Sequence, residues 1–448
     1  MEFACFRRKG RVALAVVHIG RRRGPLVPAA CPARRYGPRH DPPAGSPYNP
    51  GIGDVAGAVP GQWWEMRMGI RRALLWVAAA GCGLGLCRAG AQAPADATPG
   101  PDPAAEVALL DRLGPDARLR RTDHFLIAYD TPEETIRSLV SRLEATYRAV
   151  FRVCAVNGIP AEHPGERLEV LCFHRFEDYA RFAAESGFAA AGTAGFYNQA
   201  NNLAAFVNVL NLPELSALNR SVETHRRRLD TLRAARPSHR EALDRQQRQW
   251  RRLAGERDRF VERANRLTVQ HEAAHQILFN AGVHVRGAQN PGWLVEGLAC
   301  LFETPPSRWG AGPGATNQMR LGDFRSSLGG GDPSARLRPD DIQRAFESGT
   351  FVPLRELVGE ADLFSRREDP NLVYHYCQAW SLVCYLQRAH RLEFAEYTRR
   401  LAGRRPGERL PAEAEIAEFE DVFGPLDERF ERRWARYVLS LRFRPGER

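Results

Sequence analysis

The pair His271 and His275, in Val-Gln-His-Glu-Ala-Ala-His-Gln, constrains this chain more than any other sequence feature. Histidines four residues apart share one face of an α-helix, so both imidazoles can reach the same metal ion. Glu272 follows the first histidine and can stand beside a water on the metal without being a ligand. A chain of this length contains His-Glu-x-x-His by chance about one time in fifty. The surrounding residues therefore have to show whether the pair belongs to a metal site.

The residues that follow the pair strengthen the case for a metal site. Gly282 is a natural stop for the helix that carries the histidines. The segment 290–299, Asn-Pro-Gly-Trp-Leu-Val-Glu-Gly-Leu-Ala, predicts a second helix with Pro291 in its first turn. Its Glu296 lies twenty-one residues after His275. Two histidines and one carboxylate leave the fourth position of a tetrahedral zinc open for water, as in catalytic zinc sites.

These two segments resemble a known class of enzyme. His-Glu-x-x-His, then Pro-x-Trp-Leu-x-Glu-Gly-Leu-Ala and a glutamate at 303, is similar to the gluzincin zinc peptidases of the peptidase-MA group. The pattern is most similar to an uncharacterised peptidase-like domain family of exported bacterial proteins. The resemblance spans about residues 122–445, and its specific motifs lie within residues 268–303.

The resemblance implies a role for each of these side chains. The implied zinc ligands are His271, His275 and Glu296. Glu272 would be the catalytic base, and Glu303 a partner that orients a ligand histidine, although a solvated helix carboxylate is its plainer interpretation. Members of the group often carry a tyrosine before a Gln-Ala-Trp helix, and Tyr376 fits as a donor to the oxyanion. A core position explains Tyr376 equally well, and Tyr374 or His375 are alternative donors.

The fold class that the whole pattern predicts is α+β, a gluzincin-like zinc peptidase. Hydrophobic periodicity over 106–212 predicts a small mixed sheet with helices. The predicted elements of this lobe are strands at 124–130 and 168–173, a helix at 132–154 and a hairpin with strands at 193–197 and 203–208. This hairpin could supply an edge strand that binds an extended peptide.

An inserted helical hairpin is predicted over 213–266. Apolar residues at spacings of three and four on both sides of Pro237 indicate two antiparallel helices packed as a coiled coil. Fifteen arginines against eight acidic residues make it basic, which favours a solvated surface or docking onto an acidic partner. The zinc-binding helices are predicted at 267–303 and a mainly helical C-terminal lobe at 304–448, clearest at 374–387 and 430–443.

A targeting signal is predicted near the start of the chain. A basic stretch at 67–72 precedes an apolar run at 73–86, and Ala-Gln-Ala at 91–93 offers a cleavage site. This order is typical of a secretory signal peptide, assigned here to 66–93, and predicts an exported protein of the periplasm, cell envelope or medium. The apolar run is too short for a membrane span.

The segments on either side of this signal are expected to lie outside the folded protein. Residues 1–65 are rich in Arg, Pro and Gly and are interpreted as a mis-annotated or disordered extension. Residues 94–105 are rich in Pro, Ala and Asp and are predicted to be a linker. A lipid anchor through Cys82 or Cys87 is the competing interpretation of the signal.

The net charge of +11 suggests a nucleic-acid-binding protein until it is divided along the chain. Fourteen basic and four acidic residues precede residue 94, which leaves fifty basic and forty-nine acidic residues after it. Without residues 1–93 the chain is nearly neutral, so we exclude nucleic acid as a partner. The resemblance to the gluzincins implies a peptide or protein substrate instead.

Five cysteines follow the predicted signal, Cys154, Cys172, Cys300, Cys377 and Cys384. Their odd number and the absence of a Cys-x-x-Cys pair favour buried free thiols over a disulfide.

Three functions remain after this reading of the sequence. A zinc metallopeptidase is the first, and the lack of a Gly-x-Met-Glu-Asn exopeptidase motif favours an endopeptidase. The second is a catalytically silent binding protein of the cell envelope that keeps the peptidase fold and uses the helical hairpin as its contact surface. The third is a zinc hydrolase acting on a non-peptide amide or ester.

Overall fold

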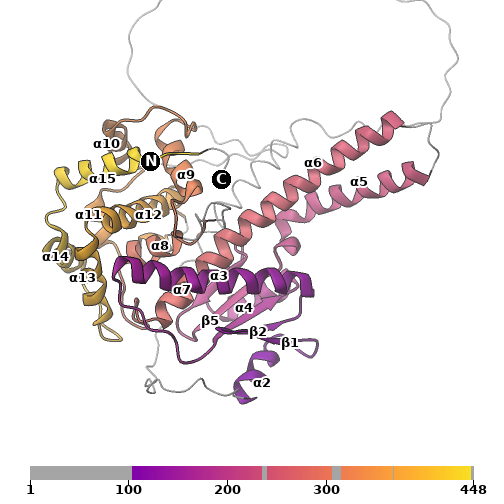
Figure 1. Ribbon diagram of the computed structural model, residues 1–448, viewed down its shortest axis with the longest axis horizontal. Coiled ribbons are helices and arrows are strands. Elements are labelled where there is room, and N and C mark those ends of the chain that lie inside the picture. Colours follow the sequence, from indigo (N-terminus) through magenta and orange to yellow (C-terminus); the bar gives the residue numbers. More distant parts are fainter. Residues whose placement is uncertain (1–102, 235–239, 305–313, 367, 445–448) are drawn as a thin grey trace, which may run out of the picture. The chain divides into compact units, whose positions relative to one another are not determined.

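The computed structural model describes residues 103–234, 240–304, 314–366 and 368–444, all of which belong to one compact unit (Figure 1). The fold is α+β, mostly helical with a small mixed sheet of five strands, as the periodicity predicts. The extension 1–65 and the signal peptide 66–93 lie outside the described residues. The predicted linker overlaps the first helix, because α2 (Pro103–Asp111) already begins at residue 103.

The sheet has the strand order β1-β2-β3-β5-β4. Its strands are β1 (Arg118–Arg121), β2 (Phe125–Tyr129), β3 (Leu168–Phe173), β4 (Gly195–Asn198) and β5 (Leu203–Val207). The three central strands are parallel, with Ile127 opposite Val170 and Val170 opposite Ala204. The two edge strands β1 and β4 run antiparallel to their neighbours.

Helices cover both faces of this sheet, which is why its central strands are almost entirely apolar, with Glu169 the one charged residue in them. Side chains such as Ile127 pack with α3 (Glu133–Asn157) and α7 (His271–Asn280) on one face. Neighbours such as Ala128 pack on the other face with α4 (Phe176–Glu185) and the base of the helical hairpin.

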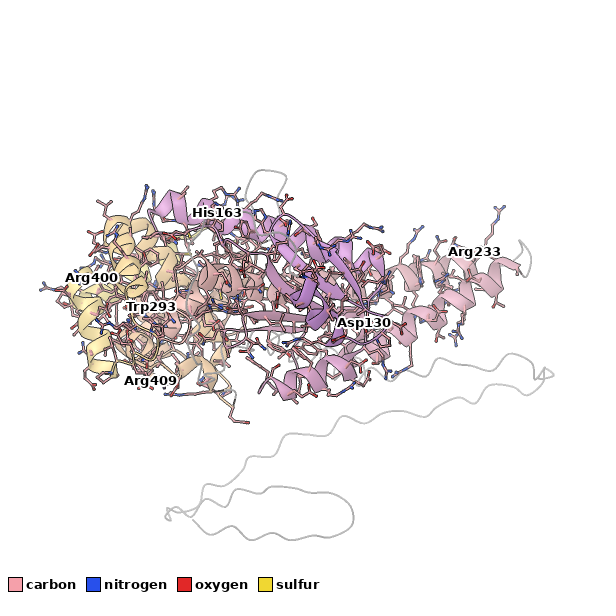
Figure 2. The ribbon with its side chains drawn as sticks, turned by 90° about the horizontal axis from the view of Figure 1, so that it is seen from below. Asp130, His163, Arg233, Trp293, Arg400 and Arg409 are labelled. Atoms are coloured by element: carbon pink, nitrogen blue, oxygen red, sulfur yellow. The ribbon has the colours of Figure 1, made fainter. Side chains whose placement is uncertain are left out.

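The hairpin consists of α5 (Ser216–Ala234) and α6 (Arg240–Asn265), which lie side by side, with Arg233 near its far end (Figures 1 and 2). Two short turns, η1 (Val209–Asn211) and η2 (Pro213–Leu215), connect it to β5. Helix α6 passes through one π-helical segment, η4 (Arg266–Gln270), directly into α7. The expected boundary at 266/267 therefore falls inside one helical run, and π-segments of this kind are common beside functional sites.

The C-terminal part is a helical layer built around α12 (Leu372–Ala389), which contacts α8, α9, α13 and α15. The remaining elements are α8 (Gly292–Cys300), α9 (Gln318–Leu328), α10 (Pro339–Glu347), α11 (Leu354–Gly359), η5 (Leu363–Ser365), α13 (Arg391–Ala402), α14 (Ala412–Phe423) and α15 (Glu428–Ser440). Trp293 on α8 lies inside this layer and is fully buried (Figure 2). A Cβ atom on Gly297 would lie 2.6 Å from the carbonyl oxygen of Ala379, so α8 can approach α12 this closely only with glycine there.

The five cysteines are free thiols, and only Cys384 is not fully buried, as the sequence predicts. Within the described ranges, no helix combines the length and apolar character that a membrane crossing requires.

Candidate metal centre

Two consecutive helices bring the predicted ligands together. Helix α7 carries the histidines, and α8 carries Glu296. Gly282 adopts a φ of +75°, a left-handed conformation that ends α7 as expected. The side chain of Asn290 then closes the connecting loop, since it accepts a hydrogen bond from the Val285 N–H and donates one to the Val285 carbonyl. The loop returns the chain so that α8 packs against α7.

Three nitrogen and oxygen atoms converge at the contact between these helices. His271 Nε2 lies 3.0 Å from His275 Nε2 and 3.1 Å from Glu296 Oε2, and the third side of the triangle is 3.4 Å. Ligand bonds of about 2.0–2.1 Å around a tetrahedral zinc place neighbouring ligand atoms about 3.3 Å apart. The triangle thus has the size that one such ion requires. Each of the three residues is at most 2% exposed.

The electrostatics of this triangle favour a bound cation. Burial would raise the pKa of Glu296, but His275 and His271 outweigh it and hold that pKa well below its ordinary value. Burial would lower the pKa of His271, but contacts with Cys300, Glu296 and Glu303 raise it well above its usual range. The Glu296 carboxylate is therefore ionised and available to a cation.

A buried carboxylate lies behind the first ligand. Glu303 Oε1 is 2.9 Å from His271 Nδ1, and the carboxylate accepts hydrogen bonds of 2.6 and 2.7 Å from Arg320 and one of 2.9 Å from Asn317. Glu303 is fully buried, so the alternative of a solvated carboxylate does not hold. The arrangement directs the Nε2 lone pair of His271 toward the triangle and is typical of histidine ligands.

Arg320 and Asn317 were not among the site residues predicted from the sequence. Both belong to the start of α9, where Asn317 caps the helix by accepting from the Met319 and Arg320 N–H groups. A cap residue and one arginine among many carry no sequence signal for a contact with Glu303. That contact depends on how α9 packs.

A second group of candidate metal ligands comprises His271, Cys300 and Glu303. It shares its histidine with the triangle but uses the opposite ring nitrogen. Both oxygens of Glu303 are already engaged, by Arg320, Asn317 and His271. The triangle is therefore the better metal site.

Glu272 lies next to the triangle and is held by the sheet. Its Oε2 accepts a hydrogen bond of 2.9 Å from the Tyr197 N–H on the edge strand β4. The carboxylate is buried, and burial raises its pKa to about 8. Its partner belongs to the predicted strand pair, although the pairing of Tyr197 with Glu272 has no sequence signature.

Tyr376 approaches the same place from α12. Its ring centroid lies 6.1 Å from that of His271, and its buried hydroxyl has no hydrogen-bond partner among the described residues. The alternative donors point elsewhere: His375 Nε2 is 2.9 Å from Asp369, and the Tyr374 ring packs near Phe351.

A family described as "Protein of unknown function (DUF1570)" matches residues 265–408. The match covers less than half of the chain but includes all the side chains of the centre described above, from His271 to Tyr376. Comparisons with curated proteins and with solved structures gave no match. The matched family names no chemistry, so the peptidase resemblance stays a prediction.

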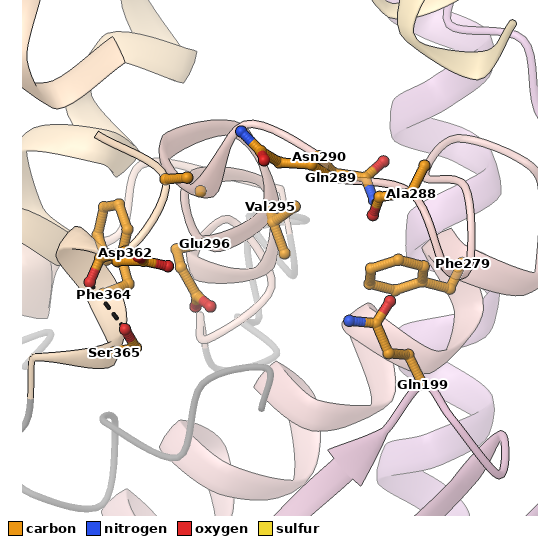
Figure 3. A pocket seen from close by; sticks show the side chains of 12 residues that line it. Gln199, Phe279, Ala288, Gln289, Asn290, Val295, Glu296, Asp362, Phe364 and Ser365 are labelled. Atoms are coloured by element: carbon orange, nitrogen blue, oxygen red, sulfur yellow. Dashed lines mark hydrogen bonds between the residues drawn. The ribbon is translucent and has the colours of Figure 1, made fainter. Parts of the chain in front are cut away.

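A pocket opens beside the third ligand (Figure 3). Glu296 lies between Asp362, Phe364 and Ser365 on one side and Phe279 and Gln199 on the other. A molecule in this pocket would therefore lie directly beside the triangle.

Another buried histidine lies close to the centre, although its position in the sequence has no ligand spacing. His284 is 1% exposed, and its ring centroid is 5.1 Å from that of Phe279. Burial and the neighbouring His275 lower its pKa to about 3, so it is neutral. It belongs to neither group of candidate ligands and is interpreted as a core residue.

Proposed function

We propose that this protein is a zinc-dependent metallopeptidase, acting as an endopeptidase, with zinc held by His271, His275 and Glu296. The observation that carries the proposal is the buried triangle of two imidazoles and one carboxylate with a second carboxylate, Glu272, beside it.

The donor set supports zinc over the common hard cations. Calcium and magnesium prefer sites made of oxygen ligands, whereas two imidazoles with one carboxylate are typical of catalytic zinc. Glu303 and its partner Arg320 would fix the orientation of His271, as carboxylates behind zinc-bound histidines do.

The chain's own residues would perform the proton transfers. A zinc ion at the triangle supplies a Lewis acid, which acidifies water and polarises the scissile carbonyl. Glu272, held in place by the Tyr197 N–H, would accept a proton from the attacking water and deliver it to the leaving amine. The Tyr376 hydroxyl, which is buried without a partner in the described chain, would donate a hydrogen bond to the carbonyl oxygen as negative charge develops there.

The edge strand β4 supports a peptide as the substrate. It ends the sheet and lies against α7, beside Glu272. An extended peptide could add to such an edge through its backbone, with its scissile bond near the triangle. The proposal includes export through the signal peptide predicted at 66–93.

The first test measures the metal content of the purified protein by inductively coupled plasma mass spectrometry. We expect one zinc per chain in the wild type and a sharp loss in His271→Ala and Glu296→Ala. His163→Ala, which changes an exposed histidine outside the centre, serves as the control. Full zinc retention by Glu296→Ala would show that the third ligand is wrongly assigned.

The second test separates an enzyme from a silent binding protein. Glu272→Gln should keep its zinc but lose hydrolysis of a protein substrate such as casein by about 100-fold or more. Wild-type zinc content without turnover of any peptide, ester or amide substrate would favour the binding protein that uses the hairpin. Full activity in Glu272→Gln would exclude Glu272 as the base.

A further inference from the structure

The pocket beside Glu296 carries information about the substrate, on the basis of the proposed function. Its apolar wall consists of Phe279, Val295 and Phe364, each no more than 5% exposed. Phe279 comes from α7, Val295 from α8 and Phe364 from η5, so three elements of the core hold the wall in place. A wall of this kind suits an aliphatic chain rather than a polar one.

One buried acceptor in the pocket has no partner. Gln199 follows β4, is 8% exposed and lines the pocket opposite Asp362 (Figure 3). Its Oε1 atom has no hydrogen-bond partner among the described residues. A buried acceptor without a partner is costly, so its presence here favours a ligand that brings a donor.

Three neutral polar side chains of the pocket are already engaged. The Asn290 amide binds the Val285 backbone, Gln289 donates to the Leu410 carbonyl, and the Ser365 hydroxyl donates to the Asp362 carbonyl. Gln199 Oε1 differs from these groups because it is open to a ligand.

The charge of the pocket is negative. Asp362 lines it from an exposed position, and no ion pair of its carboxylate is found within the described ranges. Arg366, a nearby basic residue, pairs with Glu360. No arginine, lysine or histidine occurs among the described side chains that line this pocket. The carboxylates of Glu296 and Glu272 together would balance the two charges of a zinc ion at the triangle, which leaves the charge of Asp362 unbalanced.

We propose that this pocket binds a basic side chain, lysine or arginine, of the substrate next to the scissile bond. The aliphatic stem would lie along Phe279, Val295 and Phe364. The charged end would donate a hydrogen bond to Gln199 Oε1, and Asp362 would supply negative potential at the mouth.

The test measures binding, so it does not depend on turnover. Three probes share a metal-binding hydroxamate and differ in one side chain: the Nα-acetyl hydroxamates of lysine, norleucine and glutamate. Binding to the zinc-loaded protein is measured by isothermal titration calorimetry, and zinc content is measured on the same samples. We expect the lysine probe to bind about tenfold more tightly than the norleucine probe, because a hydrogen bond to a charged group is gained. The glutamate probe should bind most weakly.

Two variants locate the preference. Gln199→Leu removes the open acceptor. Asp362→Lys reverses the charge at the mouth, at an exposed side chain that makes no helix-cap hydrogen bond. Each should reduce the lysine preference at least about threefold while zinc content and melting temperature stay at wild-type values. Glu347→Lys, an equal charge reversal at an exposed position outside the pocket, should change nothing.

The outcomes separate this inference from the proposed function. Bound zinc with equal affinity for the lysine and norleucine probes overturns the inference and leaves the metal centre standing. A lysine preference that survives in both variants also overturns it, because the basic group then binds elsewhere. Absence of zinc from the wild type overturns the proposed function, and the inference with it.

Discussion

Replacing Arg320 by methionine tests whether the buried network behind His271 controls both stability and metal affinity. Arg320 and Glu303 are joined by hydrogen bonds of 2.6 and 2.7 Å, and their side chains are 2% and 0% exposed. Removing one partner of a buried ion pair leaves an uncompensated charge and costs about 3–5 kcal/mol. For a domain of this size, we expect the melting temperature of the metal-free protein to fall by about 5–15 °C.

The same substitution should weaken zinc binding. Burial would raise the pKa of Glu303, but Arg320 and His271 outweigh it and lower that pKa to about 2. Without the guanidinium the carboxylate becomes easier to protonate and is a poorer acceptor for the Nδ1–H of His271. Loss of such a partner typically weakens metal binding by about 10–100-fold.

Two assays and two further variants test this prediction. Circular dichroism melting in excess chelator reports the metal-free stability, and competition with a chromophoric chelator reports the zinc affinity. Arg432→Met is the control: it breaks the exposed ion pair with Glu428 and should cost less than about 1 kcal/mol. The double variant Arg320→Met with Glu303→Met removes both buried charges and should recover stability but not zinc affinity. Unchanged melting temperature and unchanged zinc affinity in Arg320→Met would refute the reasoning.

Three further predictions follow from the geometry. Tyr376→Phe should lower kcat by about 100-fold with zinc content unchanged, because one donor to the developing oxyanion is lost; an unchanged kcat would assign Tyr376 to the core instead. Gly297→Ala should destabilise the protein by about 1–3 kcal/mol in thermal unfolding, since the added Cβ meets Ala379 and Val383; an unchanged melting temperature would mean that α8 and α12 can separate at no cost. Removing zinc with 1,10-phenanthroline should lower the melting temperature, because an ion present at about 100 times its Kd stabilises the folded state by about 2.7 kcal/mol; no shift would count against a metal in the folded core.

Much of the fold follows from local patterns. The strands at 124–130 and 168–173 and the long helix after Pro132 appear close to the predicted positions, because apolar periodicity reflects burial directly. Edge strand β1 and helix α4 have no counterpart among the predicted elements. Strand β1, Arg-Leu-Arg-Arg, is almost entirely basic and only partly buried, so its pairing with β2 and not its composition makes it a strand.

The sequence pattern also did not predict that α6 continues into α7. The inserted hairpin was predicted to end at residue 266, just before the zinc-binding helices. In the structure the helix continues through the π-helical segment into the histidine pair.

The sequence by itself determined the local half of the candidate site. His271, Glu272 and His275 lie within five residues of each other, so helical periodicity alone places both imidazoles on one face. Glu296 could be named only through its resemblance to a known motif, because no periodicity links residues twenty-one apart.

Only the tertiary structure decided what surrounds these groups. Arg320 reaches Glu303 because α9 and α8 both pack against α12. The Tyr197 N–H reaches Glu272 because β4 lies against α7. Gln199 lines the pocket from the turn that follows β4. Each contact joins segments distant in the sequence, and each depends on burial that no single segment can achieve. Periodicity records which face of an element is buried, but not which partner it meets there.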